Sequence, residues 1–286
     1  MSMIVLVLLL LISSSSSSMM FKDLNVGITG ANRGIGLGLC RRLVEEGTNV
    51  IAFARSPYSQ ELIDLSSNSK CLIIELDVSS SSSHSNALKT LTDKGVNHLD
   101  LVIANAGIAS KNHPVDPVMM CSEDDMMDLY RTNVIGTMFT LQSFAPMIRD
   151  KGICMVMSSR LASIEQCVGL GGYLSYRCSK AALNMLAQTF SEDPEMKKRG
   201  IKTLCMHPGW VQTDMGGRGG RKAQVEILES VNGITNVLAV AIKLQQSSSS
   251  SSADSISIRK EVIEFSDKFL SNNLVFTGYD FELLPF

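Results

Sequence analysis

Short aliphatic runs alternate with longer amphipathic segments along most of the chain. The runs are rich in Val, Ile and Leu, which is typical of strands covered on both faces of a sheet. We expect strands at 25–29, 49–54, 71–76, 100–104, 153–158, 202–206 and 274–277. Helical spacing fills the segments between them, including 36–46, 123–148 and 173–191. This alternation predicts an α/β fold, with a doubly wound parallel sheet of Rossmann type between two helical layers.

Serine-rich segments interrupt this pattern at three places. Residues 13–18 follow an apolar run at 4–12, and further serine runs occupy 79–83 and 247–252. Polyserine cannot bury apolar area, so we expect each run to be a surface loop or a disordered segment, and the last two to be insertions. The stretch at 245–270 is polar and helical and has the least regular pattern.

The apolar run near the N-terminus raises the question of targeting. It is shorter than the roughly 20 residues that span a bilayer, and no basic residue precedes it as in a signal peptide. We therefore expect residues 1–22 to be an extension and residues 23–286 a single domain of a cytoplasmic protein without a stable membrane span. Weak membrane or secretory targeting by the extension is the alternative.

Composition narrows the classes of partner. The chain has 286 residues, 45% of them hydrophobic, and a net charge of −2, so it can bury one large core but has no basic excess for binding nucleic acid. A small-molecule partner is favoured. The seven cysteines are scattered without a Cys-x-x-Cys pair or a histidine at ligand spacing, which indicates reduced thiols and no metal site.

A glycine-rich loop follows the first predicted strand. Residues 29–36 read TGANRGIG and lead directly into a predicted helix. Glycines let the backbone approach a pyrophosphate, and the helix N-terminus offers unpaired N–H groups and a positive dipole end. A strand-to-helix turn without a ligand is the alternative. The candidate cofactor contacts of this loop are Gly30, Asn32, Arg33, Gly34, Ile35 and Gly36.

The end of the second predicted strand indicates which dinucleotide binds. Sites that prefer NAD place an acid there to hold the ribose 2′-hydroxyl. This chain reads FARS at 53–56, and no carboxylate follows until Glu61. Arg55, with Arg33 from the glycine loop, could instead pair with a 2′-phosphate, which favours NADP. Two solvated surface arginines are the alternative.

Tyr176 and Lys180 lie one helical turn apart in the predicted helix at 173–191. A free phenol titrates near pH 10, so a tyrosine that exchanges protons at neutral pH needs a neighbouring cation, and a lysine at i+4 shares its helix face. This spacing alone also arises by chance on amphipathic helices. Together with an upstream dinucleotide loop, it indicates hydride-transfer chemistry.

Further motifs follow the strands in order. Asp77-Val78 follows the third strand, Asn105-Ala106-Gly107 the fourth, Ser158-Ser159 the fifth, and Pro208-Gly209 with Val211 and Thr213 the sixth, while Asn133 lies within a helix. With residues 29–36 and the Tyr176/Lys180 pair, these motifs resemble those of the short-chain dehydrogenases/reductases, over about 25–215 and again near the C-terminus. Segments 157–160, 176–184 and 207–217 are most similar to carbonyl reductases of the sniffer and C-factor type.

The resemblance implies a reaction and its residues. NADPH would deliver hydride to an aldehyde or ketone, Tyr176 would donate the proton, and Lys180 would lower the phenol pKa and bind the nicotinamide ribose. Ser159 would orient the carbonyl, with Ser158 and Ser163 as other candidates for that role. Asn133 would anchor a water that relays protons, unless it only bonds to backbone.

The resemblance also assigns the remaining cofactor contacts and the assembly. Asp77 and Val78 would contact the adenine end, residues 105–107 would support the sheet and the nicotinamide ribose, and residues 208–213 would cover the nicotinamide. The helices with Asn133 and Tyr176 would pair subunits in a homodimer or homotetramer. A dinucleotide-binding protein without turnover, or a dehydrogenase of steroid, fatty-acyl or sugar alcohols, are the alternatives.

Overall fold

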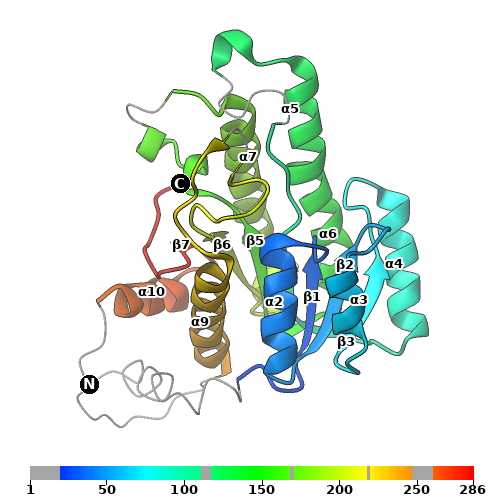
Figure 1. Ribbon diagram of the computed structural model, residues 1–286. Helices are drawn as coiled ribbons and strands as arrows, with labels where there is room; N and C mark the ends of the chain where they lie inside the picture. The colour runs from blue at the N-terminus through cyan, green and yellow to red at the C-terminus, as the bar shows by residue number, and fades with distance from the viewer. Residues whose placement is uncertain (1–19, 111–116, 168–170, 218–219, 247–259) are drawn as a thin grey trace.

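Seven parallel strands form one sheet in the order β3-β2-β1-β4-β5-β6-β7 (Figure 1). The computed structural model describes residues 20–110, 117–167, 171–217, 220–246 and 260–286. The strands are β1 (Asn25–Thr29), β2 (Asn49–Ala54), β3 (Cys71–Glu75), β4 (Leu99–Ala104), β5 (Ile148–Met157), β6 (Lys202–His207) and β7 (Leu274–Gly278). Every predicted strand is confirmed, and every neighbouring pair is parallel, as the uniformly aliphatic runs indicate.

Helices cover both faces of the sheet. The α-helices are α2 (Gly34–Glu45), α3 (Gln60–Ser66), α4 (Ser81–Asp93), α5 (Glu123–Tyr130), α6 (Gly136–Phe144), α7 (Leu174–Ser191), α8 (Pro194–Lys198), α9 (Ile227–Gln246) and α10 (Lys260–Ser271). Buried residues of α2, α3, α9 and α10 pack on one face, and those of α4, α6 and α7 pack on the other. The predicted doubly wound fold of three layers is therefore confirmed.

Alternate residues of the central strands supply the two cores. In β4, Leu101 and Ile103 join the cluster with α2 and α9, whereas Val102 and Ala104 join the cluster with α4 and α6. Successive side chains of a strand point to opposite faces, so a strand buried on both sides must be apolar throughout. This requirement explains why the strands were visible as continuous aliphatic runs.

The serine run at 79–83 is not the loop that the sequence analysis expects. Ser80 is the N-cap of α4, where its hydroxyl accepts a hydrogen bond from the backbone N–H of Ser83, and the following serines form the first helical turn. Serine suits this place because its hydroxyl replaces a missing backbone partner. The expectation overlooked that an exposed first turn needs no apolar side chain. Residues 13–18 and 247–252 lie outside the described residues.

Two further boundaries differ from the expectation. Phe21 is 1% exposed and packs in the core, so the folded part already includes it rather than beginning at residue 23. The segment predicted as one helix at 123–148 consists of α5, a π-helical turn at Arg131–Ile135, α6 and a short 3-10 turn. Strand β5 begins at Ile148, which pairs with Leu99 of β4, and the register then shifts so that Ile153 pairs with Leu101.

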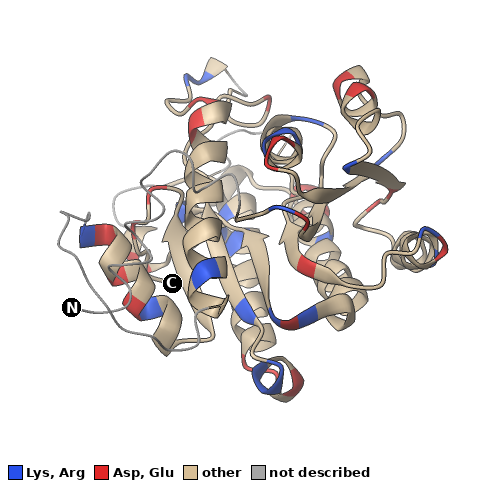
Figure 2. Cartoon of the chain, turned by 90° about the horizontal axis from the view of Figure 1, so that it is seen from below, with Lys and Arg blue, Asp and Glu red and all other residues tan. Residues whose placement is uncertain are grey.

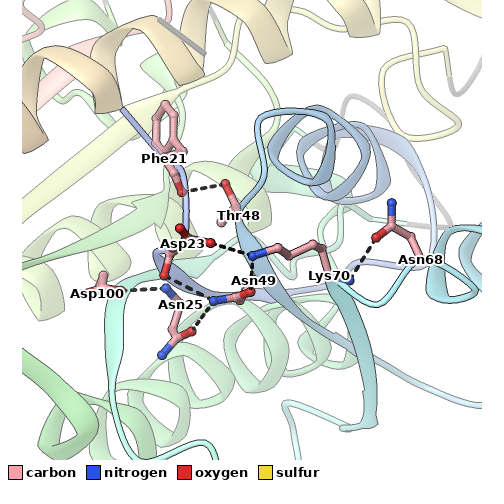
Figure 3. A network of polar contacts seen from close by, with 8 residues as sticks. All are labelled: Phe21, Asp23, Asn25, Thr48, Asn49, Asn68, Lys70 and Asp100. Carbon is pink, nitrogen blue, oxygen red and sulfur yellow. Dashed lines mark hydrogen bonds and ion pairs between the residues drawn. The ribbon is translucent and has the colours of Figure 1, made fainter. Parts of the chain in front are cut away.

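Polar contacts tie together the ends of the strands opposite the predicted site (Figure 3). The Asp23 carboxylate pairs with the Lys70 ammonium at 2.7 Å, and the Asn49 amide donates to the backbone of Asp23 and to the side chain of Asn25. The Asp100 carboxylate accepts from the Asn25 backbone N–H at 2.6 Å. These contacts join the starts of β1, β2 and β4 and fix where the chain enters the sheet.

Helix α9 is the one described helix that is long and apolar enough to cross a membrane. Most of it is buried against α2 and β5, which is also how the core helix of a soluble domain looks. Basic and acidic residues are interspersed along the helices seen from below (Figure 2).

Candidate active site

The strand order places the site at the carboxyl ends of β1 and β4. From β1 the chain proceeds outward to β2 and β3, and from β4 it proceeds the other way to β7. A sheet of this kind leaves a crevice where the direction reverses, and ligands bind there. The glycine-rich loop follows β1, and residues 105–107 follow β4. The topology thus brings together the two motifs that the sequence analysis assigned to the cofactor.

The glycine-rich loop has the shape of a phosphate cradle. Gly30 and Gly34 have φ angles of 69° and 57°, which side chains disfavour. A Cβ placed on Gly36 would lie 2.3 Å from the Gly30 carbonyl oxygen, so the loop closes on itself only with glycine there. Among the described residues, no side chain caps the N-terminus of α2, and its first turn contains no acid. The free N–H groups therefore fit an anionic ligand.

The residues after β4 hold this loop in place. The Asn105 amide donates to the Thr29 carbonyl at 2.9 Å, and the Ala106 N–H donates to the Thr29 hydroxyl at 3.1 Å. A Cβ on Gly30 would lie 2.9 Å from the Cα of Ala106, so the two segments are in direct contact. Asn105 thus supports the sheet, as predicted, and the ribose contact of residues 105–107 stays a prediction.

The polar side chains of the loop are used within the protein. The Asn32 amide accepts from the Ser59 N–H at 2.6 Å and donates to the Pro57 carbonyl at 3.1 Å, which fastens the start of α3 to the loop. Ile35 packs against the hydrophobic core. Arg33 is exposed and forms an ion pair with Asp214, which follows β6.

The residues predicted for the adenine end lie after β2 and β3. Arg55 is exposed, and its positive charge acts on Asp77. Burial, the largest influence, raises the pKa of Asp77, but hydrogen bonds from Ser79 and the charge of Arg55 outweigh it and leave that pKa below its ordinary value. Val78 is buried and packs directly on Gly136 of α6. The Asp77 carboxylate is therefore ionised at neutral pH and accepts hydrogen bonds from the backbone N–H and the hydroxyl of Ser79.

The predicted proton donor and the predicted carbonyl-orienting serine meet in the structure. Tyr176 lies in the first turn of α7, and Ser159 lies directly after β5. Burial raises the pKa of Tyr176 to about 12, and hydrogen bonding from the Ser159 hydroxyl acts in the opposite direction. The phenol therefore carries its proton at neutral pH, and a serine hydroxyl lies beside it.

The other two candidate serines are occupied elsewhere. The Ser158 hydroxyl donates to the Asn184 side-chain oxygen at 2.6 Å, and both residues are buried. The Ser163 hydroxyl accepts from the backbone N–H of Gln166 at 3.2 Å. Of the three serines, the geometry favours Ser159 as the partner of Tyr176.

Lys180 is 3% exposed and donates from Nζ to the Met157 carbonyl at 2.6 Å. Burial lowers the pKa of Lys180 to about 8. The expectation that Lys180 lowers the phenol pKa stays a prediction: in this structure burial raises the pKa of Tyr176, and the influence that opposes burial comes from the Ser159 hydroxyl. The ammonium is turned toward the backbone of β5, and its nitrogen lies 5.8 Å from the centre of the Tyr176 ring.

Asn133 lies in the π-helical turn between α5 and α6. Its side-chain oxygen accepts from the Ile108 N–H at 2.8 Å, and its amide donates to the Ile108 carbonyl and the Ser179 hydroxyl at 3.0 Å each. A Cβ on Gly107 would lie 3.2 Å from the Asn133 oxygen and 3.5 Å from the Lys180 nitrogen. Such helical distortions are frequent at functional sites. Asn133 and Lys180 thus both lie against Gly107.

The segment after β6 folds over the glycine-rich loop. The Pro208 carbonyl accepts from the Ser230 hydroxyl at 2.6 Å, and Gly209 adopts a φ of 87° against Tyr279. Val211 is buried. The Thr213 methyl would lie 3.4 Å from a Cβ on Gly34, so this segment contacts the glycine-rich loop, and its predicted contact with the nicotinamide stays a prediction.

Comparison with known proteins agrees with this geometry. The family model described as short chain dehydrogenase matches residues 25–223. The chain belongs to the short-chain dehydrogenase family. An uncharacterized oxidoreductase of Schizosaccharomyces pombe is 36% identical over 78% of this chain and 86% of its own length. A second oxidoreductase of the same yeast is 30% identical over 91% of this chain and 96% of its own length.

Solved structures add two comparisons. The NADPH-bound carbonyl reductase from chicken fatty liver is 30% identical, with a TM-score of 0.73 over 93% of this chain and 100% of that chain. A short-chain dehydrogenase/reductase from Burkholderia multivorans, solved with bound NADP, has the same TM-score at 23% identity over 92% of this chain and 100% of that chain, which shows the fold alone. The resemblance read from the motifs is therefore confirmed.

Two contacts of this short-chain dehydrogenase were missed by the sequence analysis. Ser179 links Asn133 to α7, and its place before Lys180 is the only signal that could have indicated it. Asp214 pairs with Arg33 across 181 positions of sequence, which no local pattern reveals. All seven cysteines are free thiols, and no group of three potential metal ligands occurs in the part of the chain that the structure describes.

Proposed function

We propose that this short-chain dehydrogenase reduces an aldehyde or ketone to an alcohol with NADPH, and that Tyr176 donates the proton. The observation that carries the proposal is the interaction of the Ser159 hydroxyl with the half-buried phenol of Tyr176, which acts to lower the pKa of that phenol. It lies on the two elements, the end of β5 and the start of α7, that border the crevice beyond the sheet. NADPH, when bound, supplies the hydride.

Residues of this chain donate the proton and orient the carbonyl group. With its pKa raised to about 12, the Tyr176 phenol stays protonated at pH 7 and can donate from its oxygen to a carbonyl oxygen that gains negative charge. The Ser159 hydroxyl can donate to the same oxygen and so orient the substrate and stabilise the developing charge. Lys180 is mostly charged at pH 7, and its ammonium stabilises negative charge on the phenol once the proton has left.

We base the proposed preference for NADPH on the positive charge at the adenosine end of the site. The strand end at 53–56 carries Arg55 where an NAD site carries an acid, and Arg33 extends from the glycine-rich loop. The chicken carbonyl reductase, which matches nearly the whole chain, was solved with NADPH. We expect Arg55→Asp to weaken NADPH binding more than NADH binding, because it replaces a partner of the 2′-phosphate by a like charge. Equal weakening, measured by fluorescence titration, would remove the assignment.

Turnover is tested with a matched pair of tyrosine variants. We expect the wild-type protein to oxidise NADPH in the presence of a panel of aldehydes, quinones and ketones. Tyr176→Phe should abolish this turnover while NADPH still binds, because only the donated proton is lost. Tyr130→Phe is the control, since Tyr130 is an exposed residue of α5. Full activity of Tyr176→Phe would refute the proton donor.

A further inference from the structure

A cationic cavity lies in the segment that follows β6. It has a volume of about 370 Å³ and is lined by Gln212, Gly217, Arg221, Lys222 and Ala223. This volume is within the range of small-molecule sites. Two of its five described lining residues are cations, one is an amide, and none is a carboxylate.

The charge of this segment is unbalanced in sequence as well. Residues 209–225 contain three basic residues and a single acid, Asp214. That acid forms its ion pair with Arg33 of the glycine-rich loop. The negative charge of the segment is therefore directed to the cofactor side, whereas Arg221 and Lys222 line the cavity.

Arg221 connects the cavity to the helix of the proton donor. Its guanidinium donates to the Tyr173 hydroxyl at 3.1 Å, and its central carbon lies 5.3 Å from the centre of the Tyr173 ring. Both contacts orient the planar guanidinium, since arginine stacks on aromatic faces while it donates from its edge. Tyr173 is the residue that caps α7, three positions before Tyr176.

The conformation at Tyr173 is a constrained one. Its φ of 58° is left-handed, which is uncommon for a residue with a large side chain and is frequent at functional sites. Arg177, one turn further into α7, donates to the Gly172 carbonyl at 3.0 Å and so holds the backbone just before this residue. The start of α7 thus presents Tyr173 to Arg221 and, three residues later in the first turn, Tyr176 to the crevice.

We propose that this cavity binds an anionic group of the substrate, so that the enzyme prefers carbonyl compounds that carry a carboxylate or a similar anion. The inference rests on the proposed function, whose reacting carbonyl lies at Tyr176. Arg221 and Lys222 would hold the anion by charge-assisted hydrogen bonds, and Tyr173 is the residue that positions Arg221. A guanidinium already oriented before the substrate arrives loses little freedom on binding.

Matched substrates test the preference. The probes are 4-carboxybenzaldehyde and its neutral methyl ester, and the readout is the ratio of their kcat/KM values with NADPH at low ionic strength. We expect the acid to be preferred by the wild-type protein, and the preference to fall as salt screens the charges. Arg221→Gln should reduce the ratio on the order of tenfold, as expected for loss of a hydrogen bond to a charged group.

Control variants separate charge from folding. Lys94→Gln, at an exposed position after α4, makes the same change of net charge and should leave the ratio unchanged. Arg221→Lys keeps the positive charge but lacks the forked donors of the guanidinium, so it should retain part of the preference for the acid over the ester. Binding of terephthalate, measured by calorimetry, needs no turnover and should be weaker in Arg221→Gln than in Lys94→Gln.

The outcomes distinguish this inference from the proposed function. Equal kcat/KM values for the acid and the ester in the wild-type protein, or equal terephthalate binding by Arg221→Gln and Lys94→Gln, would overturn the anionic substrate. Terephthalate binding that depends on Arg221, without oxidation of NADPH by any aldehyde, would support the anion site and refute the reductase.

Discussion

Replacing each of the two adjacent serines after β5 by alanine should have opposite effects. The Ser159 hydroxyl bonds to Tyr176 at the site, so Ser159→Ala removes a donor for the carbonyl oxygen as it gains charge. Loss of one such donor costs roughly 10²–10³ in kcat. The same change also removes the partner of the half-buried Leu161 N–H, which donates to the Ser159 hydroxyl at 3.2 Å. We therefore expect a large loss of kcat and little loss of stability.

Ser158→Ala should give the reverse result. Its hydroxyl bonds to the Asn184 oxygen at 2.6 Å, and the Asn184 amide nitrogen has no hydrogen-bond partner among the described residues. The change leaves a buried acceptor unsatisfied, which costs about 1–3 kcal/mol. For a chain of this size, each kcal/mol shifts Tm by roughly 2–4 °C. The structure therefore predicts a lower Tm with kcat within a few-fold of wild type.

Both variants are measured by thermal unfolding and by NADPH oxidation with one aldehyde. Both variants are needed because each of the two serines lies close enough to the end of β5 to orient a substrate. Ser158→Ala with a hundredfold loss of kcat and an unchanged Tm would refute the assignment of roles. So would Ser159→Ala with full activity.

Three further predictions follow from single contacts. Asp214→Asn releases Arg33 from its ion pair and should strengthen NADPH binding while NADH binding stays unchanged. Because the ion pair is exposed, we expect a gain of no more than about fivefold. A titration that shows weaker NADPH binding would contradict this prediction. Gly36→Ala should abolish NADPH binding or folding, because the Cβ meets the Gly30 carbonyl, whereas Gly171→Ala, whose Cβ would have no atom of the described residues within 4 Å, should be tolerated in the same assays. Burial lowers the pKa of Lys180 from 10.5 to about 8, so between these pH values the unfolded chain binds more protons than the folded chain, and the free energy of unfolding increases with pH. Urea unfolding at pH 8 and pH 10 should show a smaller increase in Lys180→Met than in the wild-type protein. An equal increase would contradict the burial argument.

The fold could be predicted from the sequence because strand segments buried on both faces must be apolar throughout, as residues 101–104 of β4 and 153–157 of β5 are. The serine run at 79–83 was misread because composition alone does not distinguish a loop from the exposed first turn of a helix, which Ser80 caps. The π-helical turn at Asn133 was also invisible, since its hydrogen bonds go to Ile108 and Ser179, both distant in sequence.

The sequence predicted which residues form the site, but not how the structure shifts their pKa values. The motifs placed Ser159, Tyr176 and Lys180 in one crevice, and the structure brings them together. The direction in which the pKa of Tyr176 shifts depends on burial and on where the Lys180 ammonium points, and a spacing of four residues predicts neither. The contact between Arg221 and Tyr173 spans 48 positions and has no local signature.

The most direct test of the central claim is a crystal structure with NADPH and a carbonyl compound bound. We expect the nicotinamide C4 atom roughly 3–3.5 Å from a carbonyl carbon whose oxygen accepts hydrogen bonds from Tyr176 and Ser159. A nicotinamide ring that lies away from the Tyr176 hydroxyl, with the carbonyl bonded elsewhere, would contradict the account.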